Sequence, residues 1–206
     1  ERMENATYPS SYSYKYPKAG EDNSIVSAWS FDIKSRRTQQ LNIPLAEDGY
    51  MPRILSTEDP DKIVIFTMNR HQDVLNLYSV NPRSTVSKLL IKESVPKYVK
   101  EETLDNIRLG KDYILLPSDR DGFMQLYLYS GTGTLKRKIG DGKFDITNVY
   151  GVDEKTGDVY YQAAALNAHD RQIYVSHTNG KVERLTNQEG WNTAIFSGDY
   201  QYFVNT

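Results

Sequence analysis

Cysteine is missing altogether from the 206 residues of this chain. Its absence excludes disulfide bonds and any metal or redox site built on thiolates, and it leaves the cellular compartment undecided. No stretch approaches the roughly 18 consecutive apolar residues that a membrane-spanning helix needs. An excess of one charge is also lacking, because 25 Lys and Arg stand against 27 Asp and Glu. Nothing therefore points to a nucleic acid or a membrane as a partner.

Catalytic signatures are lacking as well. The sequence contains no Gly-x-Ser-x-Gly nucleophile elbow, no Walker motif, no His-Glu-x-x-His and no Gly-x-Gly-x-x-Gly ahead of a helix. The glycines of Gly131-Thr132-Gly133 are those of a turn. Carboxylates are plentiful, but none is singled out by a second carboxylate in an apolar setting, an arrangement that some acid–base catalysts use. We therefore predict no catalytic residue, no cofactor and no metal within the chain.

The organising stretch is Ser118 to Gly133. Its polar start closes at Gly122, and an apolar run from Phe123 to Tyr129 follows before the next Gly-rich turn. The length of the run and its Leu and Tyr content favour a strand over a helix. Leu and Tyr alternate along it, so both faces of the strand should be buried.

The same strand recurs along the chain. Aligned strand endings place an aromatic residue at Trp29, Tyr78, Tyr127 and Tyr174, at intervals of 49, 49 and 47 residues. A period of this length, with several strands in each unit, is typical of β-propeller blades. Because Tyr78, Tyr127 and Tyr174 belong to the repeat itself, we expect them to be packing residues.

Each unit divides into an inner hairpin, the aromatic strand and a more polar outer strand. The predicted outer strands are Gln39 to Ile43, Thr85 to Ile91, Leu135 to Ile139 and Lys181 to Thr186. Residues 93–105 keep no helical period and read as a long connecting loop with room for one helical turn. The sequence thus predicts an all-β fold, a partial β-propeller of about three whole four-stranded antiparallel blades and two half-blades. A closed propeller needs more blades than these. We therefore expect residues 1–206 to be a fragment of one propeller domain from a longer protein, with no catalytic domain. The start at Glu1, without Met or a signal peptide, agrees with this expectation.

One rim of such an arc should carry the long charged loops, and binding usually occurs there. In a four-stranded meander, the second-to-third loops share a rim with the fourth-to-first connections. The candidate substrate-facing residues on this rim are Arg70, His71, Tyr98, Arg120 and His169. The alternative is that these loop charges are solvated or paired within their own loops, as most surface charges are. The two histidines lie in different blades without a fixed third ligand, which argues against a metal site.

Several passages of the chain resemble the propellers of the dipeptidyl peptidase IV family, in the family's order. The passages are Tyr16-Pro17-Lys18-Ala19-Gly20 with Asn23, Tyr50-Met51-Pro52-Arg53-Ile54, Asn69-Arg70-His71-Gln72, Ser118-Asp119-Arg120-Asp121-Gly122 with Gln125-Leu126-Tyr127, and Val149 to Asp153 with Gly157 to Tyr161. The Ser-Asp-Arg-Asp-Gly type also occurs in TolB-like propellers, whereas the Tyr-Pro-Lys-Ala-Gly segment is more specific.

The resemblance implies part of a bacterial-type serine exopeptidase of the prolyl oligopeptidase group, which releases N-terminal dipeptides with Pro or Ala in second place. The family's Ser-Asp-His triad lies in an α/β-hydrolase domain downstream, and the paired Glu residues that hold the substrate amine lie upstream. The family's counterpart of Pro96 to Asn106 approaches the substrate, which is why Tyr98 is a candidate.

Two functions follow as hypotheses. In the first, the chain is a lid and substrate-access domain over that catalytic domain, and the family suggests a periplasmic or exported protein. In the second, it is a non-catalytic TolB-like propeller that binds a protein or peptide. In either case we expect the outer half-blades to favour self-association of the chain.

Overall fold

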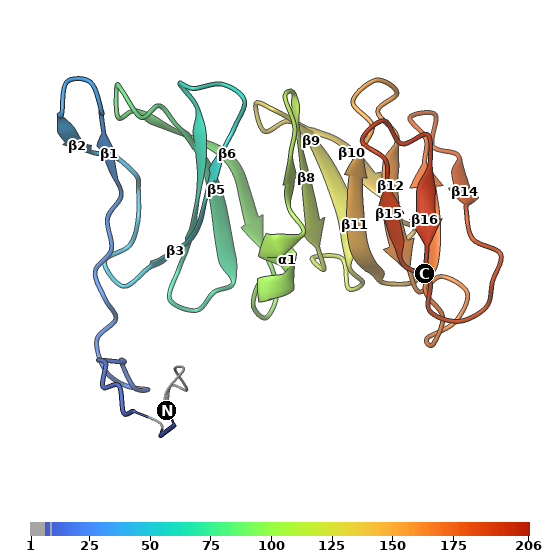
Figure 1. The fold of residues 1–206 in the computed structure, drawn as a ribbon, viewed down its shortest axis with the longest axis horizontal. Coiled ribbons are helices and arrows are strands. Elements are labelled where there is room, and N and C mark those ends of the chain that lie inside the picture. Colours follow the sequence, from blue (N-terminus) through green and yellow to red (C-terminus); the bar gives the residue numbers. More distant parts are fainter. Residues whose placement is uncertain (1–6, 9) are drawn as a thin grey trace.

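The structure is a computed structural model that describes residues 7, 8 and 10–206. It consists of five antiparallel sheets that stand side by side in the order of the chain (Figure 1). The three central sheets have four strands each, and the two outermost sheets have two. Within every sheet, neighbouring strands are consecutive in sequence, so each is a simple meander. The predicted partial propeller, with three whole blades and a half-blade at each end, is confirmed.

The strands have the following bounds. The first half-blade holds β1 (Trp29–Phe31) and β2 (Thr38–Gln40). The first blade holds β3 (Tyr50–Ser56), β4 (Ile63–Met68), β5 (Val74–Val80) and β6 (Ser87–Ser94). The second blade holds β7 (Arg108–Leu109), β8 (Tyr113–Ser118), β9 (Gln125–Ser130) and β10 (Leu135–Ile139). The third blade holds β11 (Ile146–Val152), β12 (Val159–Ala163), β13 (Gln172–Ser176) and β14 (Val182–Arg184). The last half-blade holds β15 (Ala194–Phe196) and β16 (Phe203–Asn205).

Strand β9 shows why these segments fold as they do. Leu126 and Tyr127 point to opposite faces, and both are buried because a neighbouring blade covers each face. The strand begins at Gln125, two residues later than the sequence predicted. Phe123 lies outside it and is 43% exposed. The predicted burial on two faces is therefore confirmed, whereas the predicted start is wrong.

The recurring aromatics behave as expected where a blade is whole. Tyr78, Tyr127 and Tyr174 are buried, which confirms their packing role. Trp29, at the equivalent place in the first half-blade, is largely exposed. It belongs to a sheet of two strands, so less of the fold is available to cover it.

The connection between the first and second blades contains a short helix, α1 (Glu101–Asp105). The loop that precedes it begins at Val95, because β6 continues to Ser94, beyond the predicted end of the strand. Leu104 is buried in the core between the two blades, together with Val99. On its outer side, α1 is held by Arg53 of β3, whose Nη2 lies 2.8 Å from Asp105 Oδ1. The helix is thus fastened over the seam between two blades (Figure 1).

The main cores lie between sheets rather than within them. One core joins the first and second blades through Phe66, Leu77 and Leu116, and another joins the second and third through Leu126 and Tyr161. Among the described residues, no helix has both the length and the hydrophobicity needed to cross a bilayer.

Candidate functional site

Hydrogen bonds fasten the loops and connections of one rim to each other. Val95 N donates to Asp73 O at 3.0 Å, which ties the connection after β6 to the loop between β4 and β5. Ile146 N, at the start of β11, donates to Met124 O at 2.9 Å in the loop between β8 and β9. In the third blade, Arg171 N donates to Gly190 O at 3.0 Å. The prediction that second-to-third loops share a rim with fourth-to-first connections is confirmed.

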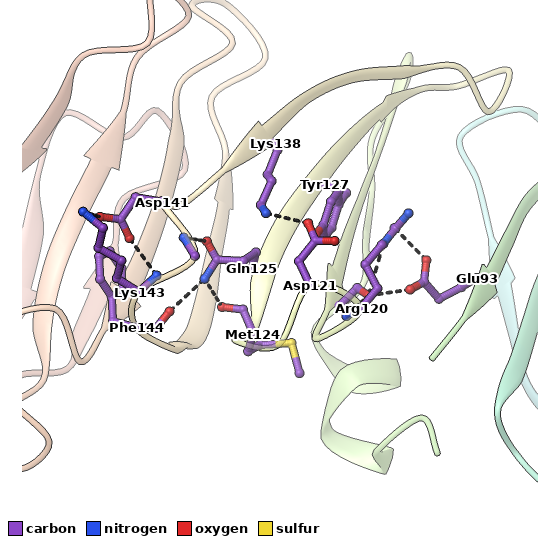
Figure 2. A network of polar contacts seen from close by, with 12 residues as sticks. Glu93, Arg120, Asp121, Met124, Gln125, Tyr127, Lys138, Asp141, Lys143 and Phe144 are labelled. Carbon is purple, nitrogen blue, oxygen red and sulfur yellow. Dashed lines mark hydrogen bonds and ion pairs between the residues drawn. The ribbon is translucent and has the colours of Figure 1, made fainter. Parts of the chain in front are cut away.

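Two buried glutamines hold these connections in place. Gln125 of β9 is fully buried, and its Nε2 donates to Met124 O and Phe144 O, both at 2.8 Å. Its Oε1 accepts from Gly142 N at 2.9 Å, as Figure 2 shows. Gln172 stands two residues before its repeat aromatic, as Gln125 does, and donates to Gln188 O at 2.9 Å. The rim is therefore built on rigid supports, which suits a binding surface.

A second network surrounds Arg120 in the loop after β8. Its Nη2 lies 2.6 Å from Glu93 Oε2 and donates to Tyr129 Oη at 2.9 Å. The guanidinium carbon lies 3.8 Å from the centre of the Tyr127 ring, the geometry of a cation–π contact. Glu93 also accepts a hydrogen bond from the Ser118 hydroxyl. Figure 2 shows this cluster between the blades, close to α1.

The tip of the same loop carries a second carboxylate. Asp121 Oδ2 accepts from the Tyr127 hydroxyl at 2.6 Å and from Lys138 Nζ at 2.5 Å. The hydrogen bond from Lys138, followed by that from Tyr127, lowers the pKa of Asp121. Burial and the hydrogen bond to Asp121 raise the pKa of the Tyr127 phenol. Around neutral pH the pair is therefore a phenol donating to a carboxylate, which fixes the loop and performs no chemistry.

Two cavities open on either side of α1. The first has a volume of about 330 Å³ and lies between α1 and the inner strand β11, with Leu126 and Val149 in its lining and Lys100, Asn106 and Asp145 as polar groups. The second, of about 390 Å³, lies between α1, β3 and the segment before β1. Both volumes are at the lower end of those that hold small molecules or peptide side chains.

The five predicted site residues lie on this rim but are spread over loops of three blades and the connection before α1. Tyr98 is 55% exposed and precedes α1, while His71 and His169 are exposed in the loops of the first and third blades. Arg70 donates to Tyr50 Oη at 2.6 Å, and Arg120 is bound in the network around Glu93. Both arginines are thus engaged by the protein itself, but through partners outside their own loops, which the alternative interpretation of the loop charges did not expect. Neither cavity is lined by any of the five, although Gln72 and Val99 in the second cavity are neighbours of His71 and Tyr98.

In the part of the chain that the structure describes, no three His, Asp or Glu side chains are grouped so as to hold a metal ion. Sequence reasoning missed Glu93, Gln125 and Gln172. A signal existed for the glutamines, since both stand two residues before a recurring Tyr. Glu93 gave none, because it opens the predicted connecting loop, where a single Glu looks like any exposed charge.

The four-stranded meanders form a row, pack face to face and carry their long loops on one rim. Such an arrangement is a segment of a β-propeller. A family model described as the dipeptidyl peptidase IV (DPP IV) N-terminal region matches residues 1–206. The chain belongs to this family.

Relatives and solved structures agree with that assignment. The chain is 23% identical over 210 residues to dipeptidyl peptidase 4 of Trichophyton rubrum, covering 96% of this chain and 27% of that protein. It is 24% identical over 203 residues to a probable dipeptidyl-aminopeptidase B of Paracoccidioides lutzii, covering 88% of this chain and 22% of that protein. The crystal structure of Porphyromonas gingivalis dipeptidyl peptidase 4 matches with a TM-score of 0.90 and 37% identity, over 98% of this chain and 29% of that one. A putative dipeptidyl aminopeptidase IV from Bacteroides ovatus shares the fold, with a TM-score of 0.74 and 18% identity, over 97% of this chain and 31% of that one.

Proposed function

We propose that this chain is the propeller segment of a serine-type dipeptidyl peptidase, an enzyme that releases N-terminal dipeptides with Pro or Ala in second place. The observation that carries the proposal is the family match over residues 1–206, together with a 37% identical solved dipeptidyl peptidase 4 that superposes along nearly the whole chain. The catalytic nucleophile belongs to a separate α/β-hydrolase domain of the same longer protein. Residues 1–206 are then one stretch of a single propeller domain.

In this proposal the rim acts as a lid that limits access to the catalytic domain. Support comes from its construction, because α1 is held by the buried Leu104 and by an ion pair with Arg53, while the two cavities remain open beside it. A rigid rim can position a peptide without having to order itself first. Tyr98, Arg70, His71, Arg120 and His169 are the rim residues proposed to face substrate. Arg120 can do so only if it leaves Glu93.

The test uses the longer protein that carries this chain. It should release the chromophore from Gly-Pro-p-nitroanilide and lose that activity on treatment with a serine-directed inhibitor. The matched control is the same substrate with an acetylated N-terminus, which should be inert because an exopeptidase requires the free amine. A longer protein with no turnover, and with no Gly-x-Ser-x-Gly elbow in the sequence that follows, would instead favour a non-catalytic propeller of the TolB-like kind that binds a protein or peptide.

A further inference from the structure

A buried carboxylate lies near the end of a polar outer strand. Strand β6 is the outer strand of the first blade, and Lys92 and Ser94 on either side of Glu93 face solvent. Glu93 itself is 1% exposed. Ionised carboxylates are almost never buried to this degree unless they are paired, because desolvation disfavours their charge.

The partners of Glu93 belong to the next blade. The Ser118 hydroxyl donates to Oε1 from the end of β8, and Arg120 Nη2 approaches Oε2 to 2.6 Å from the loop that follows. Within its own sheet, Glu93 is paired along the backbone with Leu75, whose side chain offers no polar group. The Glu93 carboxylate therefore links the first and second blades at the rim.

Arg120 is enclosed by the same arrangement. Its Nη2 reaches Tyr129 Oη, its Nε reaches Ser118 Oγ at 3.3 Å, and its guanidinium lies over the Tyr127 ring. In this position its Nε and Nη2 groups are committed to other parts of the protein. The backbone N–H of Arg120 also donates to Ser118 Oγ at 3.1 Å, so the conformation of the loop depends on the same group of atoms.

We propose that Glu93 and Arg120 form a proton-sensitive latch between the first and second blades, which holds Arg120 inward while Glu93 is ionised and releases it to the rim when Glu93 binds a proton. This goes beyond the peptidase proposal and does not depend on it. A neutral carboxyl keeps its hydrogen bond with Ser118 but loses the charge that fixes Arg120. The acidic groups left near Arg120 are then Asp119 and Asp121 in its own loop, with Asp121 also held by Lys138.

The charges around Glu93 determine the direction of the response. Burial raises the pKa of Glu93, and the nearby charges of Asp119 and Asp121 raise it further. The Ser118 hydrogen bond and the charge of Arg120 lower it, but the net effect is a raised pKa. When folding raises the pKa of a carboxyl, its contribution to stability is fully present at pH values below its unfolded-state pKa. That contribution is lost as the pH rises through the folded-state pKa. Protonation of Glu93 on acidification therefore opens the latch without itself unfolding the chain.

Hydrogen exchange followed by mass spectrometry tests the latch between about pH 4 and pH 8, after correction for the intrinsic exchange rate. In the unmodified chain, peptides covering residues 119–122 should exchange slowly at neutral pH. They should lose roughly tenfold or more of that protection on acidification, as expected when a charge-assisted hydrogen bond is released. The midpoint should lie above that of an exposed Glu, and a peptide covering β12 should not change.

Glu93→Gln imitates the protonated state with little change of shape, so its 119–122 loop should exchange fast at every pH. The matched control is Glu189→Gln at an exposed position, which should behave as the unmodified chain. Protection of 119–122 that is independent of pH in the unmodified chain would overturn the proposal, and so would a pH response that survives in Glu93→Gln. If that variant does not fold, the titration of the unmodified chain decides alone.

Discussion

Gln125 offers the sharpest test of how the rim is held. Replacing it with Ala removes three hydrogen bonds, to Met124 O and Phe144 O at 2.8 Å and from Gly142 N at 2.9 Å. Because the side chain is fully buried, the backbone groups it leaves behind lose their partners. At about 1 kcal/mol for each group, the free energy of unfolding should fall by about 3 kcal/mol.

Urea denaturation and thermal melting should both report the loss. For a domain of this size, about 3 kcal/mol corresponds to a fall in Tm of roughly 6–12 °C. Gln125→Glu can still accept from Gly142 but cannot donate, so its loss should also be substantial. Gln201→Ala, at an exposed position, should stay within about 0.5 kcal/mol of the unmodified chain. A loss below about 1 kcal/mol in Gln125→Ala would refute the view that Gln125 anchors the connection between β10 and β11.

Three further predictions concern the activity and assembly of the protein. The 206-residue chain alone should release nothing above blank from Gly-Pro-p-nitroanilide, since a loop Ser without a base is inert; inhibitor-sensitive turnover would contradict this. In the longer protein, Tyr98→Ala should change kcat/KM for dipeptide substrates with an unchanged Tm, and unaltered kinetics across several substrates would make Tyr98 an ordinary surface residue. Light scattering at micromolar concentration should show association of the isolated chain, because the two-stranded end sheets expose Trp29, Phe31 and Ile195; a monomer that persists over dilution would mean that these ends cover themselves.

Much of the fold could be predicted from the sequence because the repeat is carried by packing residues. An aromatic side chain that fills the same place in each blade has to recur at the blade period, as Tyr78, Tyr127 and Tyr174 do. Strand ends were less predictable. The sequence predicted that the outer strand of the first blade ends at Ile91, whereas β6 continues to Ser94. Its backbone pairing with β5 extends through these last polar residues.

The supports of the rim could not be predicted in the same way. The burial of Glu93 depends on Ser118 and Arg120, which are 25 and 27 residues away and belong to another sheet. No local pattern reports such a contact. The same contact gives Arg120 a structural partner that its place in a charged loop did not reveal.

We expect the rim around α1 to face the substrate in the longer protein. Residues 1–206 contain no cysteine, so Tyr98→Cys on this rim and Ser35→Cys in the turn between β1 and β2 on the other each place one thiol in this segment, which mass spectrometry can follow. The decisive measurement is the rate of maleimide labelling at each site, followed by mass spectrometry, with and without a dipeptide boronate inhibitor. The inhibitor should slow labelling at position 98 and leave labelling at position 35 unchanged. Equal labelling of position 98 in both states would contradict this expectation.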